Sequence, residues 1–298
     1  MTANDSAGPR TTPAASWLSL PAPVRQLFDR FPLTTPAPNR LPQRSPRDRS
    51  KHVLYIFPDP WNNSAEAPSC NPSCLKWQAF LQFRGIRPLL RPSNNHASPS
   101  GALPFLVPAS SGDGELPKAP VTASKLPAWI ISQGGPEEEE KGRGDTREDV
   151  YTALIDSDVR SAWLYNLYID SDNFRAVSWP LYVATVSRSR AVQHATANQL
   201  RNAAFDELAK TSPIVDGTAL YEAADEAFKA LSTLLGTSDS FFFFNAAEPG
   251  LFDASLFAYT HLLLEFEPRW ASLQLVNILK KYDNLVAHRD RLLRQYFS

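Results

Sequence analysis

The apolar positions between residues 50 and 135 fall in short runs, separated by prolines, glycines and polar stretches. Residues 53–57 form a compact apolar run that ends at a proline, which predicts a buried strand. Helically spaced apolar positions then predict a helix with Asn71 as N-cap, Pro72 in its first turn and Gly85 at its end. Three later runs each predict a further strand, over 86–91, 101–107 and 128–132.

The pattern changes to long, helically spaced apolar runs from residue 147 onward. These runs predict helices over 150–168, 173–188, 191–209, 216–235, 251–266, 271–282 and 284–297. The run 251–266 is apolar nearly all round except at Asp253, so we expect it to be the buried central helix. No repeat of fixed period is visible in the sequence, which favours a bundle over a solenoid.

The order of these elements predicts two folded domains behind an irregular arm. Strand, helix, strand, a Leu-Pro strand and a further short strand is the order of a thioredoxin-like domain, which we assign to 51–135 with a surface insertion at 109–125. Residues 136–148 read as an acidic linker and 149–298 as an all-helical domain. This layout is that of a glutathione transferase. The predicted fold class is therefore α+β/α, glutathione-transferase-like, with an N-terminal thioredoxin-like domain and a C-terminal all-α bundle.

Residues 1–50 form a Pro/Arg-rich arm that carries one short amphipathic stretch. Val24, Leu27, Phe28 and Phe31 fall on one face of a predicted one-to-two-turn helix. Two interpretations remain open for this candidate interaction segment. It either docks on the protein's own body or serves as a docking peptide for another subunit.

Charge and cysteine content exclude several classes of protein. The formal net charge of −1 argues against a nucleic-acid partner. The two cysteines, Cys70 and Cys74, form no disulfide framework and fit a reducing compartment. The first residues lack the apolar core of a signal peptide and the Arg-rich pattern of a matrix-targeting peptide. No run reaches the roughly 18–20 apolar residues that span a bilayer, so we expect a soluble protein or one held at a membrane by a partner.

The cysteines are the candidate chemistry. A working transferase needs a hydroxyl or thiol near the end of its first strand to stabilise the glutathione thiolate. Cys70 lies just ahead of the predicted N-cap, where the helix dipole favours a lower thiol pKa, and Cys74 lies in the first turn. Their Cys-x-x-x-Cys spacing differs from that of disulfide oxidoreductases. The alternatives are a catalytic Cys70 or two buried small hydrophobes.

Two further positions bear on a ligand site. Pro104 stands where thioredoxin-like domains place a cis proline, whose neighbouring backbone binds a ligand's peptide, so it is either a fold-determining turn or part of a retained site. The Glu/Gln-Ser pair that follows the fourth strand of transferases occurs only in reverse order, as Ser132 and Gln133. The histidines are scattered without metal-ligand spacing, so we predict neither a metal nor a cofactor.

Asp253 is the second position that we expect to determine the fold. Transferases begin the central helix with a Ser or Thr N-cap and place an Asp three residues later, a box that pairs free backbone N–H groups. Gly250 stands here in place of the hydroxyl residue. We therefore expect the box to be half present.

Several stretches resemble the metaxin family. The resemblance covers about residues 52–297 and rests on 74–83 (CLKWQAFLQF), 94–104 (NNHASPSGALP) and 252–257 (FDASLF). Two more stretches, 20–32 (LPAPVRQLFDRFP) and 162–168 (AWLYNLY), resemble the family's fungal branch in the mitochondrial sorting and assembly machinery, the SAM complex. The absence of a C-terminal anchor from this sequence favours that peripheral branch over the anchored one.

The resemblance implies a non-enzymatic protein-transport role. It implies a peripheral position on the cytosolic face of the mitochondrial outer membrane, with the β-barrel core subunit and a second metaxin-like subunit as partners. It also implies recognition of the sorting signals of β-barrel precursors, which we expect to add along a sheet edge. The alternatives are a glutathione-dependent transferase or thiol reductase using Cys70, and a translation-associated module, whose usual companion domains are missing here.

Overall fold

The computed structural model describes residues 50–62, 64–110, 118–134, 146–236 and 241–297, which belong to one compact unit that runs from Pro46 to Ser298. The candidate interaction segment Val24, Leu27, Phe28 and Phe31 lies outside the described residues, and so does the acidic run at 137–140. None of the described helices is both long enough and apolar enough to cross a membrane.

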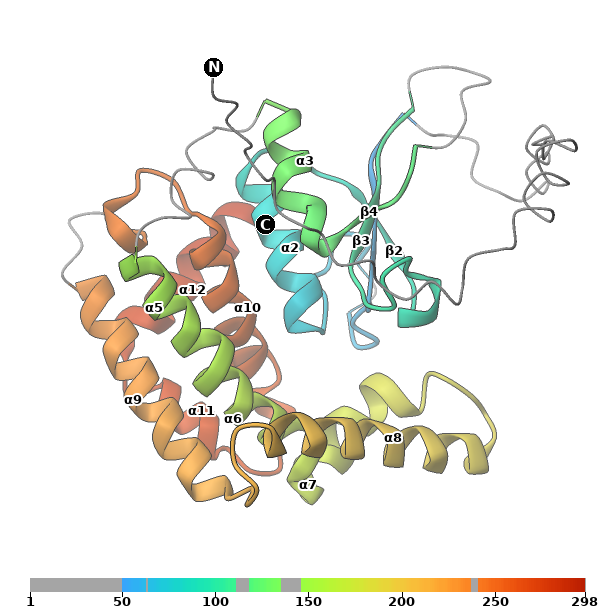
Figure 1. Ribbon diagram of the computed structural model, residues 1–298, viewed down its shortest axis with the longest axis vertical. Helices are drawn as coiled ribbons and strands as arrows, with labels where there is room; N and C mark the ends of the chain where they lie inside the picture. The colour runs from blue at the N-terminus through green and yellow to red at the C-terminus, as the bar shows by residue number, and fades with distance from the viewer. Residues whose placement is uncertain (1–49, 63, 111–117, 135–145, 237–240, 298) are drawn as a thin grey trace, which may run out of the picture. The chain divides into compact units, whose positions relative to one another are not determined.

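A small mixed sheet forms the first part of this unit (Figure 1). Its strands are β1 (Val53–Ile56), β2 (Leu89–Pro92), β3 (Phe105–Val107) and β4 (Val121–Thr122), and their order across the sheet is β2-β1-β3-β4. β1 pairs in parallel with β2 and antiparallel with β3, which pairs antiparallel with β4. This arrangement has the strand order and directions of the predicted thioredoxin-like domain.

The helix after β1 begins and ends where the sequence predicts. Helix α2 (Pro72–Phe83) has Asn71 as its N-cap, and the Asn71 side chain accepts a hydrogen bond from the backbone N–H of Cys74 at 3.2 Å. Gly85 follows the C-cap with a φ of +70°, a conformation that costs other residues energy.

The fourth strand predicted over 128–132 is wrong. Those residues belong to helix α3 (Leu126–Ser132), and β4 lies instead within the stretch that we predicted to be a surface insertion, 109–125. The composition of Trp129, Ile130 and Ile131 suggested a strand. Leu126 and Ile130, however, lie four residues apart and are both fully buried, which places them on one face of a helix. The helix that normally follows the last strand is therefore present.

The second part of the unit is helical, and the predicted helices appear there with two adjustments. The α-helices are α5 (Thr146–Leu154), α6 (Arg160–Leu164), α7 (Ser171–Asn173), α8 (Arg190–Ala209), α9 (Gly217–Gly236), α10 (Leu251–Glu265), α11 (Gln274–Leu279) and α12 (Asp283–Tyr296). Three π-helical stretches continue them: η5 (Ile155–Val159), η6 (Tyr165–Ile169) and η7 (Phe174–Val183). Short 3₁₀ turns are η2 (Asn95–Ala97), η3 (Ala123–Lys125), η8 (Phe243–Asn245) and η9 (Glu267–Arg269).

The adjustments are that wide π turns interrupt the predicted helix 150–168, and that the predicted helix 173–188 ends at Val183. Pro180 lies inside η7 and has no N–H to donate, so a regular α-helical ladder is interrupted there.

Helix α10 is the centre of the core, as its apolar sequence predicts. Most of its side chains are buried, and it packs against α2, α11, α12 and η5. The packing of α10 on α2 joins the sheet part and the helical part in one continuous hydrophobic core. The loops between β1, α2 and the helical part are therefore held on a rigid base.

Candidate functional site

The loop between β1 and α2 is where a transferase would hold its thiol-activating group, and here the end of this loop, at Ser69 and Cys70, is buried. Cys70 is 1% exposed, and its Sγ donates to the backbone oxygen of Pro58 at 3.1 Å. The hydroxyl of Tyr182, from η7, donates to the backbone oxygen of Cys70 at 3.0 Å. The thiol therefore points into the protein while a side chain from the helical part covers its backbone.

A second set of hydrogen bonds fixes the same loop from the side of α2. The backbone N–H of Ser69 donates to Gln78 Oε1 at 2.9 Å, and the Ser69 hydroxyl donates to the backbone oxygen of Phe57 at 2.6 Å. Gln78 Nε2 donates in turn to the backbone oxygen of Ala67 at 3.1 Å. Both Ser69 and Gln78 are fully buried, so these bonds are shielded from water.

Aromatic rings complete the cover over the loop. The Tyr182 ring stands edge-on to Phe57 with ring centroids 5.6 Å apart, and Tyr168 lies beside Tyr182 at 6.1 Å. Nothing in the sequence indicates that Tyr182, more than a hundred residues from Phe57, contacts it, or that Tyr168 lies beside Tyr182. Their distance along the chain explains why sequence reasoning missed them.

Burial determines the protonation state of both thiols. Desolvation by burial raises the pKa of the Cys70 thiol well above its usual value. Desolvation likewise raises the pKa of the Cys74 thiol to about 12. The expectation that the helix dipole lowers the pKa of Cys70 is therefore wrong, because the loss of water around the thiol outweighs the dipole. Both thiols are protonated at neutral pH.

The backbone donor next to Pro104 already has a partner within the protein. The peptide bond between Leu103 and Pro104 is cis. The backbone N–H of Leu103, the donor that a bound peptide would use beside such a proline, donates to Asn95 Oδ1 at 3.0 Å. Leu103 is 4% exposed. This donor is already paired within the protein.

The position of β4 moves the place where a γ-glutamyl-binding pair would lie. The predicted Ser132 and Gln133 lie at the C-terminal end of α3, where the Ser132 hydroxyl donates to the backbone oxygen of Trp129 at 2.6 Å. The residues that directly follow β4 are Ala123 and Ser124. Ala123 has no polar side chain where transferases carry Glu or Gln, and the error in strand assignment hid this.

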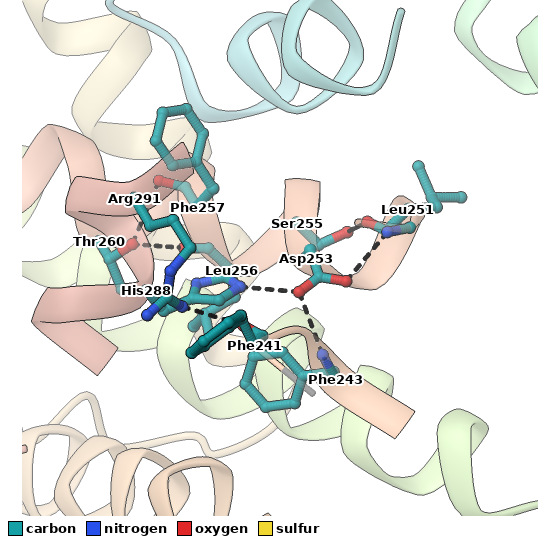
Figure 2. A network of polar contacts seen from close by, with 11 residues as sticks. Phe241, Phe243, Leu251, Asp253, Ser255, Leu256, Phe257, Thr260, His288 and Arg291 are labelled. Atoms are coloured by element: carbon teal, nitrogen blue, oxygen red, sulfur yellow. Dashed lines mark hydrogen bonds and ion pairs between the residues drawn. The ribbon is translucent and has the colours of Figure 1, made fainter. Parts of the chain in front are cut away.

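Asp253 joins three segments of the helical part (Figure 2). Its Oδ2 accepts from the backbone N–H of Gly250 at 3.0 Å, which is the half of the N-terminal box that the sequence predicts. Its Oδ1 accepts from the backbone N–H of Phe243 at 3.3 Å and from His288 Nε2 at 2.7 Å. Asp253 and His288 are both buried, so the last helix is tied to the start of the central helix.

The β2 edge of the sheet offers few N–H donors to an added strand. The backbone N–H of Leu89 donates to His52 and that of Ser93 donates to Ile56, so the N–H groups at these alternate positions face β1. The intervening positions face outward, and they are Pro88, Leu90 and Pro92. Only Leu90 carries an outward N–H, because proline has none. Prolines on an edge strand hinder pairing with another strand.

The described residues also contain no group of three or more His, Cys, Asp or Glu side chains that could hold a metal ion. Within this fold the Cys70 thiol is buried, the Leu103 N–H is already paired, and Ala123 after β4 has no polar side chain.

Comparisons with known proteins agree with a glutathione-transferase-like fold. The family described as "Glutathione S-transferase N-terminal domain" matches residues 72–173, and "Glutathione S-transferase, C-terminal domain" matches residues 224–292. Metaxin-3 of Xenopus laevis is 26% identical over 253 residues, which cover 80% of this chain and 75% of that protein.

Two solved structures extend the comparison. A glutathione S-transferase of Ceriporiopsis subvermispora in complex with glutathione matches with a TM-score of 0.53 and 13% identity, over 82% of this chain and 97% of that one. Glutathione transferase GSTFuA3 from Phanerochaete chrysosporium matches with a TM-score of 0.47 and 14% identity, over 79% and 97%. The predicted glutathione-transferase-like fold is confirmed by the domain matches and the first of these structures.

Proposed function

Because this chain belongs to a metaxin-like family with a glutathione-transferase fold, we propose that it is a non-enzymatic subunit of the machinery that inserts β-barrel proteins into the mitochondrial outer membrane. Within that machinery we assign it to the fungal type of metaxin-like subunit in the SAM complex. It is a peripheral protein on the cytosolic face, and it helps to receive the sorting signals of β-barrel precursors.

The observation that carries the non-enzymatic part of the proposal is the burial of Cys70 at the end of the β1–α2 loop. A transferase needs an accessible group that stabilises a thiolate. Cys70 is instead buried and protonated beneath Tyr182. A reactive thiol needs a lowered pKa and solvent access, and Cys70 has neither.

The alternative, a transferase or thiol reductase that uses Cys70, gains no support from this geometry. The Leu103 N–H is paired with Asn95, and Ala123 replaces the polar residue after β4. Three elements of a glutathione site are therefore changed at once, which supports a scaffold with a binding role.

The prolines at the β2 edge limit where a precursor signal could pair with the sheet. Pro88 and Pro92 restrict strand addition at the β2 edge, so we place the recognition of a precursor signal elsewhere than on this edge. The barrel core subunit and a second metaxin-like subunit are the partners that we propose. The segment with Val24, Leu27, Phe28 and Phe31 remains our candidate for contact with one of them.

Carbonate extraction and native gel electrophoresis of mitochondria that carry a tagged copy test the proposal. We expect carbonate to release the chain, and we expect the chain to migrate in mild detergent with the outer-membrane barrel subunit in one large complex. A tagged chain found free in the cytosol and outside any such complex would overturn the proposal. Cys70→Ala serves as a control, because a binding subunit should enter the complex without this thiol.

A further inference from the structure

Residues 184–192, the turn after η7 together with the first three residues of α8 and here called the η7–α8 turn, carry two exposed valines. Val186 is 58% exposed and Val192 is 44% exposed. Every other residue of this turn is also exposed except Ser187, which is half-buried. Part of each valine therefore remains as apolar surface open to solvent.

The charge around this turn is of one sign. No aspartate or glutamate occurs between Asp172 and Asp206, whereas Arg175, Arg188, Arg190 and Arg201 do. The chain as a whole has a formal net charge of −1, so this is a local excess of positive charge. Arg188 in the turn and Arg190 at the start of α8 are both exposed, and both lie between Val186 and Val192 in the sequence. Among the described residues, no carboxylate forms a salt bridge with either of them.

Side chains on both sides of the turn pack together and fix its position. Phe174 and Val183 from η7 pack with Ala197 from α8 in a small cluster separate from the main core, and half-buried Trp179 lies against it. The Trp179 ring stands 5.5 Å from the His194 ring of α8. The far half of α8 packs on η6 and α6. Figure 1 shows the turn at the end of α8 that points away from α6 and α9.

We propose that the η7–α8 turn is a membrane-contacting tip that binds the surface of a bilayer containing anionic phospholipids. Valines enter the boundary of the acyl region, while Arg188 and Arg190 remain with the lipid phosphates. This deepens the proposed function and rests on it for its setting at the outer membrane, because it gives the peripheral subunit a bilayer contact of its own.

A bilayer suits this surface better than an acidic protein does. A stable protein interface buries about 800 Å² on each side and is anchored by large aromatic or arginine side chains in pockets. These nine residues carry two exposed arginines but no aromatic side chain, and their apolar side chains are only alanine and valine. Binding to a bilayer needs no matching pocket, only apolar side chains flanked by cations.

Vesicle sedimentation with the purified full-length chain tests the charge half of the proposal. Vesicles of phosphatidylcholine alone are compared with vesicles that also contain phosphatidylserine. We expect binding to the mixed vesicles and an about 30-fold loss of partitioning in Arg188→Gln/Arg190→Gln, because each cation near such a surface contributes about 1 kcal/mol and 1.4 kcal/mol corresponds to tenfold. The matched control Lys229→Gln/Arg294→Gln removes two exposed cations from α9 and α12 and should change partitioning less than about twofold.

A fluorophore at the turn tests the apolar half. Cys70 and Cys74 are buried, so an environment-sensitive dye should attach selectively to Val186→Cys, and Thr233→Cys on α9 provides the comparison. We expect a blue shift of the emission with mixed vesicles at position 186 and none at position 233.

Three results would overturn the proposal: no binding to the mixed vesicles, equal binding by the two double variants, or no blue shift at position 186. The tip can fail in this way while the chain still enters the outer-membrane complex. The failure of the tip and the failure of the proposed function are therefore distinguishable.

Discussion

Replacing Tyr182 with phenylalanine should loosen the buried end of the β1–α2 loop at Cys70 without disturbing its aromatic cover. The Tyr182 hydroxyl donates to the backbone oxygen of Cys70 at 3.0 Å, and both residues are buried. Phenylalanine keeps the edge-on contact with Phe57 and leaves the Cys70 oxygen without this donor. An unpaired buried carbonyl costs about 1–3 kcal/mol.

The reaction of Cys70 with a thiol reagent reports this loss directly. The buried thiol reacts only when the loop opens, so the labelling rate follows the opening equilibrium. We expect Tyr182→Phe to raise the labelling rate of Cys70 about 5- to 150-fold, from the same 1–3 kcal/mol. The measurement uses a Cys74→Ala background, so that Cys70 is the only thiol that reacts.

Thr185→Ala is the matched control, one turn further along the chain. The Thr185 hydroxyl donates only to the backbone oxygen of Leu181 at 3.2 Å, so it does not touch the loop. We expect this variant to change the rate less than about twofold. If Tyr182→Phe and its parent reacted at the same rate, the reasoning that Tyr182 holds the loop closed would be refuted.

Three further predictions concern the central helix. Gly250→Ser should raise the free energy of unfolding by about 0.5–1 kcal/mol, as measured by urea denaturation. The serine hydroxyl supplies the acceptor that the N-terminal box lacks, and the added Cβ makes only an ordinary contact with Asp253. Asp253→Ala should lower the free energy of unfolding by about 3–5 kcal/mol because it breaks a buried pair with His288, whereas Asp225→Ala on the surface should lower it by less than about 1 kcal/mol. Burial, with a smaller effect of a nearby arginine, lowers the pKa of His261 from 6.5 to about 3. The neutral His261 therefore contributes to the stability of the fold above pH 6.5, and this contribution is lost as the pH falls toward 3. Urea midpoints measured across this range should fall less steeply in His261→Phe than in the parent chain.

Local patterns in the sequence were enough to predict much of the fold. The N-cap at Asn71, the glycine after α2 and the apolar α10 each depend on neighbours within a few residues, and all appear as expected. The half box at Gly250 and Asp253 is local in the same sense. Signals of this kind act over one or two helical turns, so a single sequence can carry them.

The fourth strand failed because composition and periodicity disagreed. Trp129, Ile130 and Ile131 suggested a strand, while the spacing of Leu126 and Ile130 fits a helix. A two-residue strand such as β4 is too short to leave a periodic signal. Its pairing with β3 decides its place, and that pairing cannot be read from the residues themselves.

The burial of Cys70 could not be predicted from the sequence, for a different reason. Cys70 meets Tyr182 across 112 residues, and Asp253 meets His288 across 35. The sequence suggested two outcomes for Cys70, and only the three-dimensional contacts decide between them. The helix dipole was the one effect visible in the sequence, and burial outweighs it.

The assembly of a radiolabelled β-barrel precursor in mitochondria depleted of this chain tests the central claim most directly. We predict that the precursor reaches the outer membrane but fails to enter its mature complex, while import of a matrix-targeted precursor proceeds normally. Re-expression of the Cys70→Ala variant should restore assembly as well as the parent chain does, because the proposed role is binding. Normal barrel assembly in the depleted mitochondria, or rescue by the parent but not by a folded Cys70→Ala variant, would contradict the account.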